Sequence, residues 1–264
     1  MTRLPLALLA VSALAACATT GEGSSQDVAA AAAAPAPRSI DRQARERIGR
    51  EDMLTQMAFW ASEYQTFPND LEAAQRFADS LRRGGRADRA AQIAADALQR
   101  FPEDRTLLTT YGYAQISSAR PHEALRPLAM VAQAEPENWR VRSALGAALD
   151  QLGRYDEARR AYQEALTLQP ENAAILTNLG VSHIMAGEPA DAERYLRQAA
   201  EMRGAPPEAR QNLAIALALQ GRFDEAEQIE RVDLPPAAAA ENMRYLRSLL
   251  SDPRRWNAVR GREG

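Results

Sequence analysis

Residues 139–172 read WRVRSALGAALDQLGRYDEARRAYQEALTLQPEN, and this stretch decides the fold. Small and apolar side chains recur at helical spacing on either side of Gly153, which predicts two helices joined by a short turn. Gly146 and Ala158 are expected where the two helices cross, because a larger side chain there would push the backbones apart. Gly153 is predicted to take the left-handed conformation that closes the first helix. Pro170 cannot continue the second helix, so the stretch is one helix–turn–helix unit.

This unit recurs every 34 residues along the chain. The series with that spacing are Pro68, Pro102, Pro136 and Pro170; Ala90, Ala124, Ala158, Ala192 and Ala226; and Gly112, Gly146 and Gly180. A helix–turn–helix unit of this length, with small residues at these places, resembles the tetratricopeptide repeat. The resemblance implies an all-α solenoid, in which each unit buries its apolar face only by stacking on its neighbours.

The period sets the boundaries of the predicted segments. Five repeats are expected across residues 71–240, at 71–104, 105–138, 139–172, 173–206 and 207–240. Residues 41–70 are predicted to form an N-terminal helix that packs on the first repeat and ends at Phe67-Pro68. Residues 237–264 are predicted to form a capping helix and a tail.

Composition excludes most of the familiar chemistry. The chain of 264 residues has a net charge of −3, one Cys, two His and no Lys, so its 32 basic residues are all Arg. The absence of Lys excludes a Walker-type phosphate loop and a Schiff-base enzyme. One Cys and two His argue against a zinc site, and the net charge gives no argument for nucleic acid as a partner. We therefore expect no catalytic residues, metal, cofactor, nucleic acid or small-molecule substrate.

Residues 1–16 have the features of a secretory signal. A short basic start precedes about ten apolar residues and then small residues. This run is too short for a permanent membrane span, which needs about 20 residues. Leu14-Ala15-Ala16-Cys17 resembles the lipobox of bacterial lipoproteins. By this resemblance Leu14, Ala15 and Ala16 are recognised at the cleavage site, and Cys17 becomes the acylated first residue. The alternative is an ordinary signal with a chance Cys.

Residues 17–40 are predicted to be a flexible tether that begins with the acylated Cys17. This stretch is rich in Ala, Ser, Thr, Gly and Pro and offers little that could build a core. Acyl chains on the Cys would anchor the protein stably to a membrane. Ala18 rather than Asp follows the Cys, and by resemblance to bacterial lipoproteins this favours the periplasmic face of the outer membrane.

The first helix of each repeat is expected to face a concave groove, by resemblance to the repeat family. The candidate partner-binding residues are Tyr113, Ile116, Thr177, Asn178, Val181, Ile184, Met185, Gln211, Asn212, Ile215 and Leu219. Those of the last two repeats include more apolar side chains than a solvated face needs. An apolar groove flanked by amides suits an amphipathic helix or an extended peptide. The alternative is that some of these side chains pack between helices.

Two further predictions concern polar residues. Some members of the repeat family hold a partner's C-terminal carboxylate with Lys or Arg in the groove. The matching positions here are Gln75, Thr109, Ser143, Thr177 and Gln211, so this clamp is predicted to be absent. His183 replaces an aromatic residue of the repeat and is predicted to be a packing residue rather than a base.

The last third of the chain carries a narrower resemblance. Its most telling pieces are Gln220-Gly221-Arg222-Phe223 and Asp233-Leu234-Pro235-Pro236, where the fifth repeat stops early at a double proline. Asn178-Leu179-Gly180-Val181-Ser182 and Arg210-Gln211-Asn212-Leu213-Ala214 add to it. Together they look like the TadD family of Tad (Flp) pilus assembly lipoproteins.

This resemblance implies a pilotin-like lipoprotein that binds the secretin subunit of a Tad pilus machine and localises it at the outer membrane. The expected partner is the C-terminal segment of the secretin, held by the fourth and fifth repeats. Two alternatives stay open. One is a lipoprotein scaffold that recruits cell-wall hydrolases or other envelope assembly factors, and the other, more remote, is an enzyme.

Overall fold

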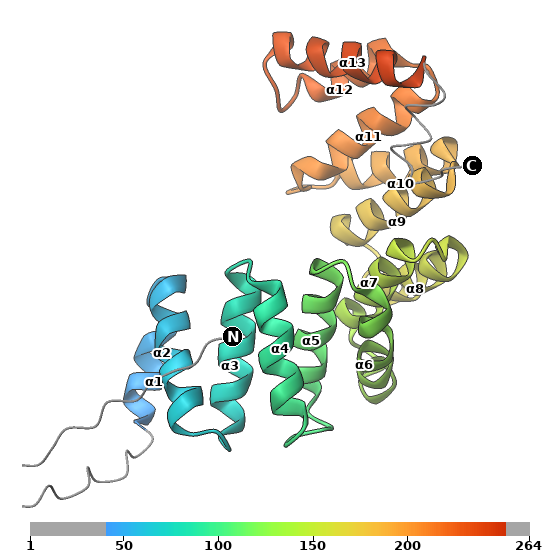
Figure 1. Ribbon diagram of the computed structural model, residues 1–264. Coiled ribbons are helices and arrows are strands. Elements are labelled where there is room, and N and C mark those ends of the chain that lie inside the picture. The colour runs from blue at the N-terminus through green and yellow to red at the C-terminus, as the bar shows by residue number, and fades with distance from the viewer. Residues whose placement is uncertain (1–40, 252–264) are drawn as a thin grey trace, which may run out of the picture. The chain divides into compact units, whose positions relative to one another are not determined.

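The computed structural model describes residues 41–251, which fold into thirteen α-helices (Figure 1). Their bounds are α1 Arg42–Ile48, α2 Met53–Thr66, α3 Leu71–Arg83, α4 Ala87–Leu98, α5 Arg105–Ser117, α6 Pro121–Ala134, α7 Trp139–Gln151, α8 Tyr155–Leu168, α9 Ala173–Ala186, α10 Pro189–Glu201, α11 Pro207–Leu219, α12 Phe223–Glu230 and α13 Pro236–Leu250. The expected all-α fold is confirmed across this range, which contains no strand. No helix within it is both long and apolar enough to cross a bilayer. The predicted signal, Cys17, the tether and the tail after Ser251 lie outside the described residues.

Helices α3 to α12 form five pairs, and each pair packs against the next along the chain (Figure 1). In four pairs the first helix starts at an Asp or Asn whose side chain accepts hydrogen bonds from backbone N–H groups of the first turn. These caps follow the repeat spacing and are Asp70, Asp104, Asn138 and Asn172. An N-cap of this kind satisfies N–H groups that have no partner inside the helix, so it fixes where each first helix begins.

The turn inside each pair is closed by a residue with positive φ. Gly85, Gly153, Gly187 and Gly221 have φ between 70° and 85°, so the conformation predicted for Gly153 is confirmed. The second repeat has Ala119 at this place, with φ 54°. Alanine has a steric cost in this region that glycine avoids, so this turn is held by its surroundings rather than by local preference.

In the second, third and fourth repeats the two helices meet at a glycine that faces a large side chain. A Cβ on Gly146 would lie 2.6 Å from the ring of Tyr162, and one on Gly180 would lie 2.5 Å from Cγ of Leu196. Gly112 is in the same position against Leu128, again at 2.5 Å. A side chain larger than hydrogen therefore does not fit at the glycine position while the facing position on the second helix holds a leucine or a tyrosine.

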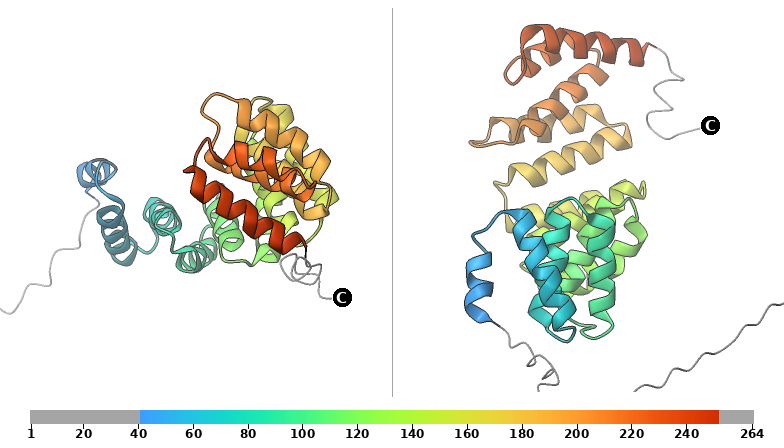
Figure 2. Two further views of the ribbon diagram at one scale, coloured as in Figure 1. Left: turned by 90° about the horizontal axis from the view of Figure 1, so that it is seen from above. Right: turned by 60° about the vertical axis from the view of Figure 1, so that its left-hand side comes forward.

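The predicted single helix before the repeats is in fact two helices. The chain turns between α1 and α2, because Asp52 caps α2 by accepting hydrogen bonds from the N–H groups of Leu54 and Thr55. Figure 2 shows α1 lying along the outer side of α2. Arg45 fixes α1 in this place. Its guanidinium is buried over Trp60, 5.5 Å from the ring centroid, and donates to three carboxylates: Glu63 at 2.7 Å, Asp70 at 2.8 Å and Glu72 at 3.0 Å.

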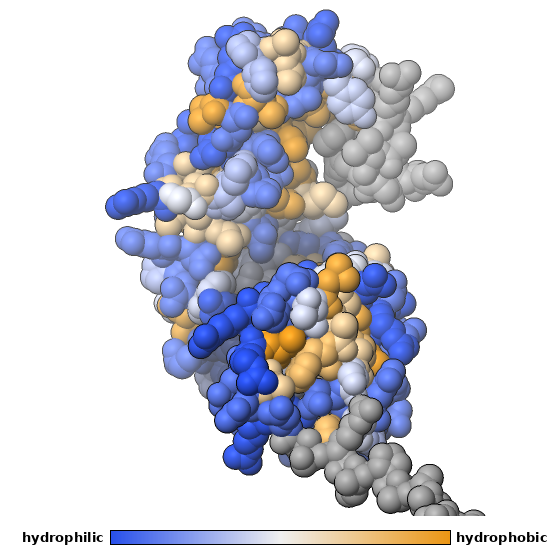
Figure 3. All heavy atoms as spheres, turned by 90° about the vertical axis from the view of Figure 1, so that its left-hand side faces the viewer, coloured by the Kyte–Doolittle hydropathy of each residue, from blue (hydrophilic) through white to orange (hydrophobic). Residues whose placement is uncertain are grey.

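The N-terminal end of the array carries exposed apolar surface. Figure 3 looks onto this end and shows an apolar area bordered by hydrophilic residues. Leu54 of α2 is 69% exposed, whereas Trp60 on the inner side of the same helix is 4% exposed. The expected packing of this helix on the first repeat is present, since Trp60, Met57 and Tyr64 belong to the same apolar cluster as Phe77.

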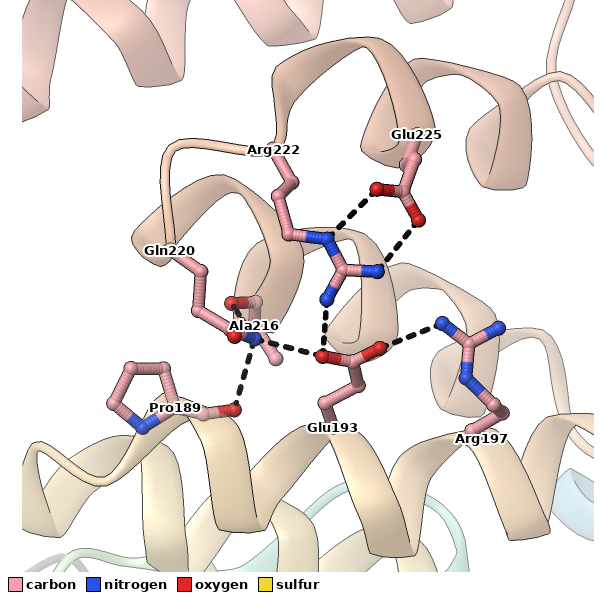
Figure 4. Close-up of polar contacts among 7 residues, drawn as sticks. All are labelled: Pro189, Glu193, Arg197, Ala216, Gln220, Arg222 and Glu225. Atoms are coloured by element: carbon pink, nitrogen blue, oxygen red, sulfur yellow. Dashed lines mark hydrogen bonds and ion pairs between the residues drawn. The ribbon is translucent and has the colours of Figure 1, made fainter.

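A polar network joins the fourth and fifth repeats (Figure 4). One oxygen of Glu193 in α10 accepts from Arg222 at 2.5 Å and from Gln220 at 3.0 Å, and the other accepts from Arg197 at 2.6 Å. Arg222 also donates two hydrogen bonds to Glu225 in α12, at 2.7 and 2.6 Å. These contacts hold the turn before α12 against the preceding helix pair. Burial alone would raise the pKa of Glu193, but the hydrogen bonds from Arg197, Gln220 and Arg222 outweigh it and lower that pKa.

The boundary between the third and fourth repeats has an equivalent ion pair in which the positions of the two charges are exchanged. Arg159 in α8 donates to Glu188 at the start of α10, at 3.1 Å. Glu193 and Arg222 lie 34 residues after these two positions, so cation and anion have changed places. A repeat shifted by one unit would put like charges together, which disfavours that register.

The helix crossing can be tested by a double-mutant cycle. Gly112→Ala should destabilise the protein by about 1–3 kcal/mol through overpacking, and Leu128→Ala by about 2–5 kcal/mol through a cavity. The first repeat has Ala78 and Ala94 at the equivalent positions, both fully buried. We therefore expect the double variant to be less destabilised than the sum of the single variants by at least about 1 kcal/mol. Urea unfolding followed by circular dichroism measures this cycle. Strict additivity would show that the glycine and the leucine do not set the crossing distance together.

The polar network can be tested by neutralising its central acceptor. Glu193→Gln should lower the free energy of unfolding at pH 7 by about 1–3 kcal/mol, because two guanidinium groups lose a charged acceptor. The matched control is Glu225→Gln, which should cost clearly less, since Glu225 is exposed and bonds only to Arg222. The folded state lowers the pKa of Glu193, so its contribution is present above the unfolded pKa and is lost as pH falls. The difference in unfolding free energy between the wild type and Glu193→Gln should therefore become smaller as the pH is lowered. A difference that stays constant down to low pH would contradict the role of the charge.

Candidate partner-binding groove

The first half of the groove contains a pocket of about 600 Å³ between α3 and α5. Its lining is polar and charged, and consists of Glu72, Gln75, Arg76, Asp79, Arg82, Arg105, Thr106, Thr109, Thr110, Tyr113, Glu135 and Asn138. Three Arg and three acidic residues balance one another in this set. Tyr113 is the candidate partner-binding residue that lines this pocket, and Gln75 and Thr109, at the positions matched to the carboxylate clamp, line it as well.

Charges in this pocket are already paired with neighbours. Arg82 donates to Asp79 at 2.7 Å and lies over the ring of Tyr113, 5.6 Å from its centroid. Arg105 donates to Glu135 at 3.3 Å. Burial raises the pKa of Tyr113, so its hydroxyl stays protonated and is a donor at neutral pH. The pocket therefore offers oriented hydrogen-bonding groups rather than a surplus of either charge.

Gln75 stands at the first of the positions where the carboxylate clamp is predicted to be absent, and its side chain is used in another contact. The side-chain amide of Gln75 donates to both carboxylate oxygens of Asp104, at 2.9 and 3.0 Å, and that carboxylate in turn caps α5. Gln75 therefore ties the first repeat to the second. Its amide nitrogen is used in this contact, so it does not replace the Lys or Arg that would bind a partner's carboxylate.

In the second half of the groove, the predicted residues differ in exposure. Met185 is 40% exposed and Gln211 is exposed. The partly exposed members are Asn178, Val181, Ile184, Asn212, Ile215 and Leu219, and in the second repeat Ile116. Thr177 is the exception, because its side chain is buried and its hydroxyl donates to the carbonyl of Ala173 at 2.7 Å. Thr177 therefore offers no hydrogen-bonding group to a partner.

Some of these apolar side chains also pack between helices. Ile184 lies against the buried cluster that contains Leu213 and Leu217, and Ile116 lies against the one that contains Leu128 and Val141. The alternative that some of these side chains pack between helices therefore holds for Ile184 and Ile116. Met185 is the most exposed of the apolar candidates, at 40%, so it is the one that a partner reaches most readily.

A polar cluster in the middle of the array was not predicted. Asp150 in α7 accepts a hydrogen bond from the hydroxyl of Tyr162 in α8 at 2.9 Å and one from Ser182 in α9 at 2.6 Å. Burial raises the pKa of Asp150 to about 6. The equivalent residues one repeat before and after are Ile116 and Ile184, so an acid between two isoleucines at the repeat spacing was the available signal.

His183 packs as predicted and also makes a polar contact. Its ring stacks on Tyr195 with centroids 5.3 Å apart, and its Nδ1 lies 2.7 Å from Oε2 of Glu188. Among the described residues, His183, Glu188 and Asp191 bring potential metal ligands within 4.8 Å of one another. The same oxygen of Glu188 accepts a hydrogen bond from Arg159, so the guanidinium of Arg159 already supplies a positive charge to this cluster.

The predicted lipidation residue Cys17 and the cleavage residues Leu14, Ala15 and Ala16 lie outside the described residues. The structure therefore does not test them. They stay predictions from the sequence.

Comparisons with known proteins agree with this architecture. Two tetratricopeptide-repeat profiles match residues 139–205 and 183–251. Among curated protein sequences none is significantly similar to the chain.

Solved structures with the same fold include several repeat proteins. MamA MSR-1 is 26% identical, with a TM-score of 0.52 over 60% of this chain and 90% of that one. TTC0263, a thermophilic TPR protein of Thermus thermophilus, is 24% identical, with a TM-score of 0.56 over 66% of this chain and 95% of that one. MamA from Desulfovibrio magneticus RS-1 is 20% identical, with a TM-score of 0.55 over 60% and 90% of the two chains. The chain is an all-α solenoid of tetratricopeptide repeats.

Proposed function

We propose that this protein is a lipid-anchored periplasmic binding protein of the outer membrane, which localises the secretin subunit of a Tad-type pilus machine. Solenoids of tetratricopeptide repeats are scaffolds that bind other proteins, and this coarser function follows from the fold. The pilus assignment is supported by the resemblance of the last third of the chain, and the membrane anchor by the lipobox at Cys17. No enzymatic family matches the chain among the profiles found.

The observation that carries the proposal is the difference between the two halves of the groove. The first half has a polar pocket with paired charges around Tyr113. The second half presents the apolar side chains of Val181, Ile184 and Met185, next to the amides of Asn178 and Asn212. A segment that lies along both halves needs polar groups at one end and apolar side chains at the other, where the amides of Asn178 and Asn212 can bond its backbone.

The role of the groove can be tested by peptide binding. The protein from residue 17 onward, with Cys17 replaced by Ser, should bind a peptide from the C-terminus of the secretin. Met185→Asp should weaken binding about tenfold or more, because a charge then replaces an apolar contact. Fluorescence anisotropy with a labelled peptide measures the Kd.

Met130→Asp is the matched control for this experiment. Met130 is also 40% exposed, but it lies on α6, the second helix of its repeat. This variant should bind the peptide within about twofold of wild type, well under the effect expected for a contact residue. Equal losses in the two variants, or no binding by the parent protein, would refute the secretin assignment.

The role of the anchor can be tested by removing the acylated residue. Cys17→Ala should move the protein from the membrane fraction to the soluble periplasmic fraction, because no acyl chains are attached. The repeats should keep their helical circular dichroism, and pili should be lost. Normal piliation by a soluble variant would show that membrane anchoring is not how the protein acts.

A further inference from the structure

Three equivalent side chains lie together at each of the boundaries that follow the second, third and fourth repeats. At the boundary between the second and third repeats these are Ile116, Leu128 and Ala148, which belong to one apolar cluster. At the boundary between the fourth and fifth repeats they are Ile184, Leu196 and Ala216, again in one apolar cluster. Both boundaries are therefore aliphatic at this place.

The boundary between the third and fourth repeats is different. The equivalent residues, 34 positions from those named above, are Asp150, Tyr162 and Ser182. They form the hydrogen-bonded cluster in which each oxygen of the Asp150 carboxyl accepts from one hydroxyl. Because the three residues come from α7, α8 and α9, the cluster joins both helices of one repeat to the first helix of the next.

The charges around this carboxyl do not neutralise it. Among residues 41–251 no cationic side chain forms an ion pair with Asp150. Arg159 of α8 exerts a weak attraction, but its guanidinium is bound to Asp156 and Glu188. From α9 the neighbouring titratable group is His183, which contacts Glu188 rather than Asp150.

We propose that the boundary between the third and fourth repeats is a pH-responsive joint, which tightens when Asp150 is protonated and loosens when it is ionised. The protonated carboxyl can donate to Ser182 while it still accepts from Tyr162, so both hydrogen bonds survive. The ionised carboxyl keeps the same two partners but carries a partly buried charge without a cation. Opening of the joint would hydrate that charge, so ionisation favours opening.

The direction and size of the effect follow from linkage. The pKa of Asp150 is about 6 in the closed joint and 3.8 is its ordinary value. Stabilisation of the closed joint is complete below the lower value and is lost as pH rises through about 6. Between about pH 7.5 and about pH 5 the opening constant should fall about tenfold. Because the joint lies between the polar and apolar halves of the groove, this change alters how the two halves are held together.

Native-state hydrogen exchange tests the joint in the intact protein. After correction for intrinsic exchange rates, amides of α9 that exchange by local opening should show about tenfold more protection at about pH 5 than at about pH 7.5. Asp150→Asn removes the titration and should abolish this change. The variant Asp150→Ile, Tyr162→Leu, Ser182→Ala restores the aliphatic set of the neighbouring boundaries and should abolish it as well.

The molecule contains its own control. Protection at the aliphatic boundary between the second and third repeats should not follow the same pH dependence. Protection of α9 that does not change with pH in the wild type would overturn the proposal. A pH dependence that persists in Asp150→Asn would show that another group causes it and would also overturn the proposal.

Discussion

The approach of two helices inside each repeat is the constraint on which the rest of the structure depends. In the middle repeats a glycine on the first helix leaves room for a large side chain from the second, as Gly146 does for Tyr162. The close approach then aligns the caps and turns at both ends of the pair, and it leaves the outer faces free to stack on neighbouring pairs. In the first repeat, where Ala78 replaces the glycine, the facing residue is Ala94, so the two side chains together rather than either one set the crossing there.

A repeated backbone still needs different side chains at its boundaries. Aliphatic clusters hold the second repeat to the third and the fourth to the fifth, whereas a carboxyl with two hydroxyls lies between the third and the fourth. The peripheral ion pairs reverse their polarity between Arg159–Glu188 and Glu193–Arg222. These differences matter physically because geometrically equivalent repeats could otherwise stack in a shifted order. They also give one boundary a chemistry that the others lack.

The groove has the same combination of regular backbone and varied chemistry. The first two repeats supply paired charges and hydroxyls around Tyr113, and the fourth and fifth supply apolar side chains and amides. Helix positions repeat, so both halves face a bound segment in the same way, but they recognise different chemical groups. A lipid anchor predicted at Cys17 would hold such a surface at a membrane, which is what a protein that positions an envelope partner requires.

Much of this architecture could be predicted because it depends on local spacing. The 34-residue period of glycine, alanine and proline, read with the known form of such repeats, determined the helix pairs, the turn at Gly153 and the crossing at Gly146, since these depend on residues close in the chain. The break between α1 and α2, the buried Arg45 and the burial of Thr177 were not predicted, because neighbours from other helices or local caps decide them. The sequence shows that Asp150 replaces the isoleucine found one repeat before and after it, but its partners, Tyr162 and Ser182, come from two other helices. The sequence by itself thus determined the repeat and its boundaries, whereas the tertiary structure decided which polar groups are buried, since burial and its effect on a charge depend on residues distant in the chain.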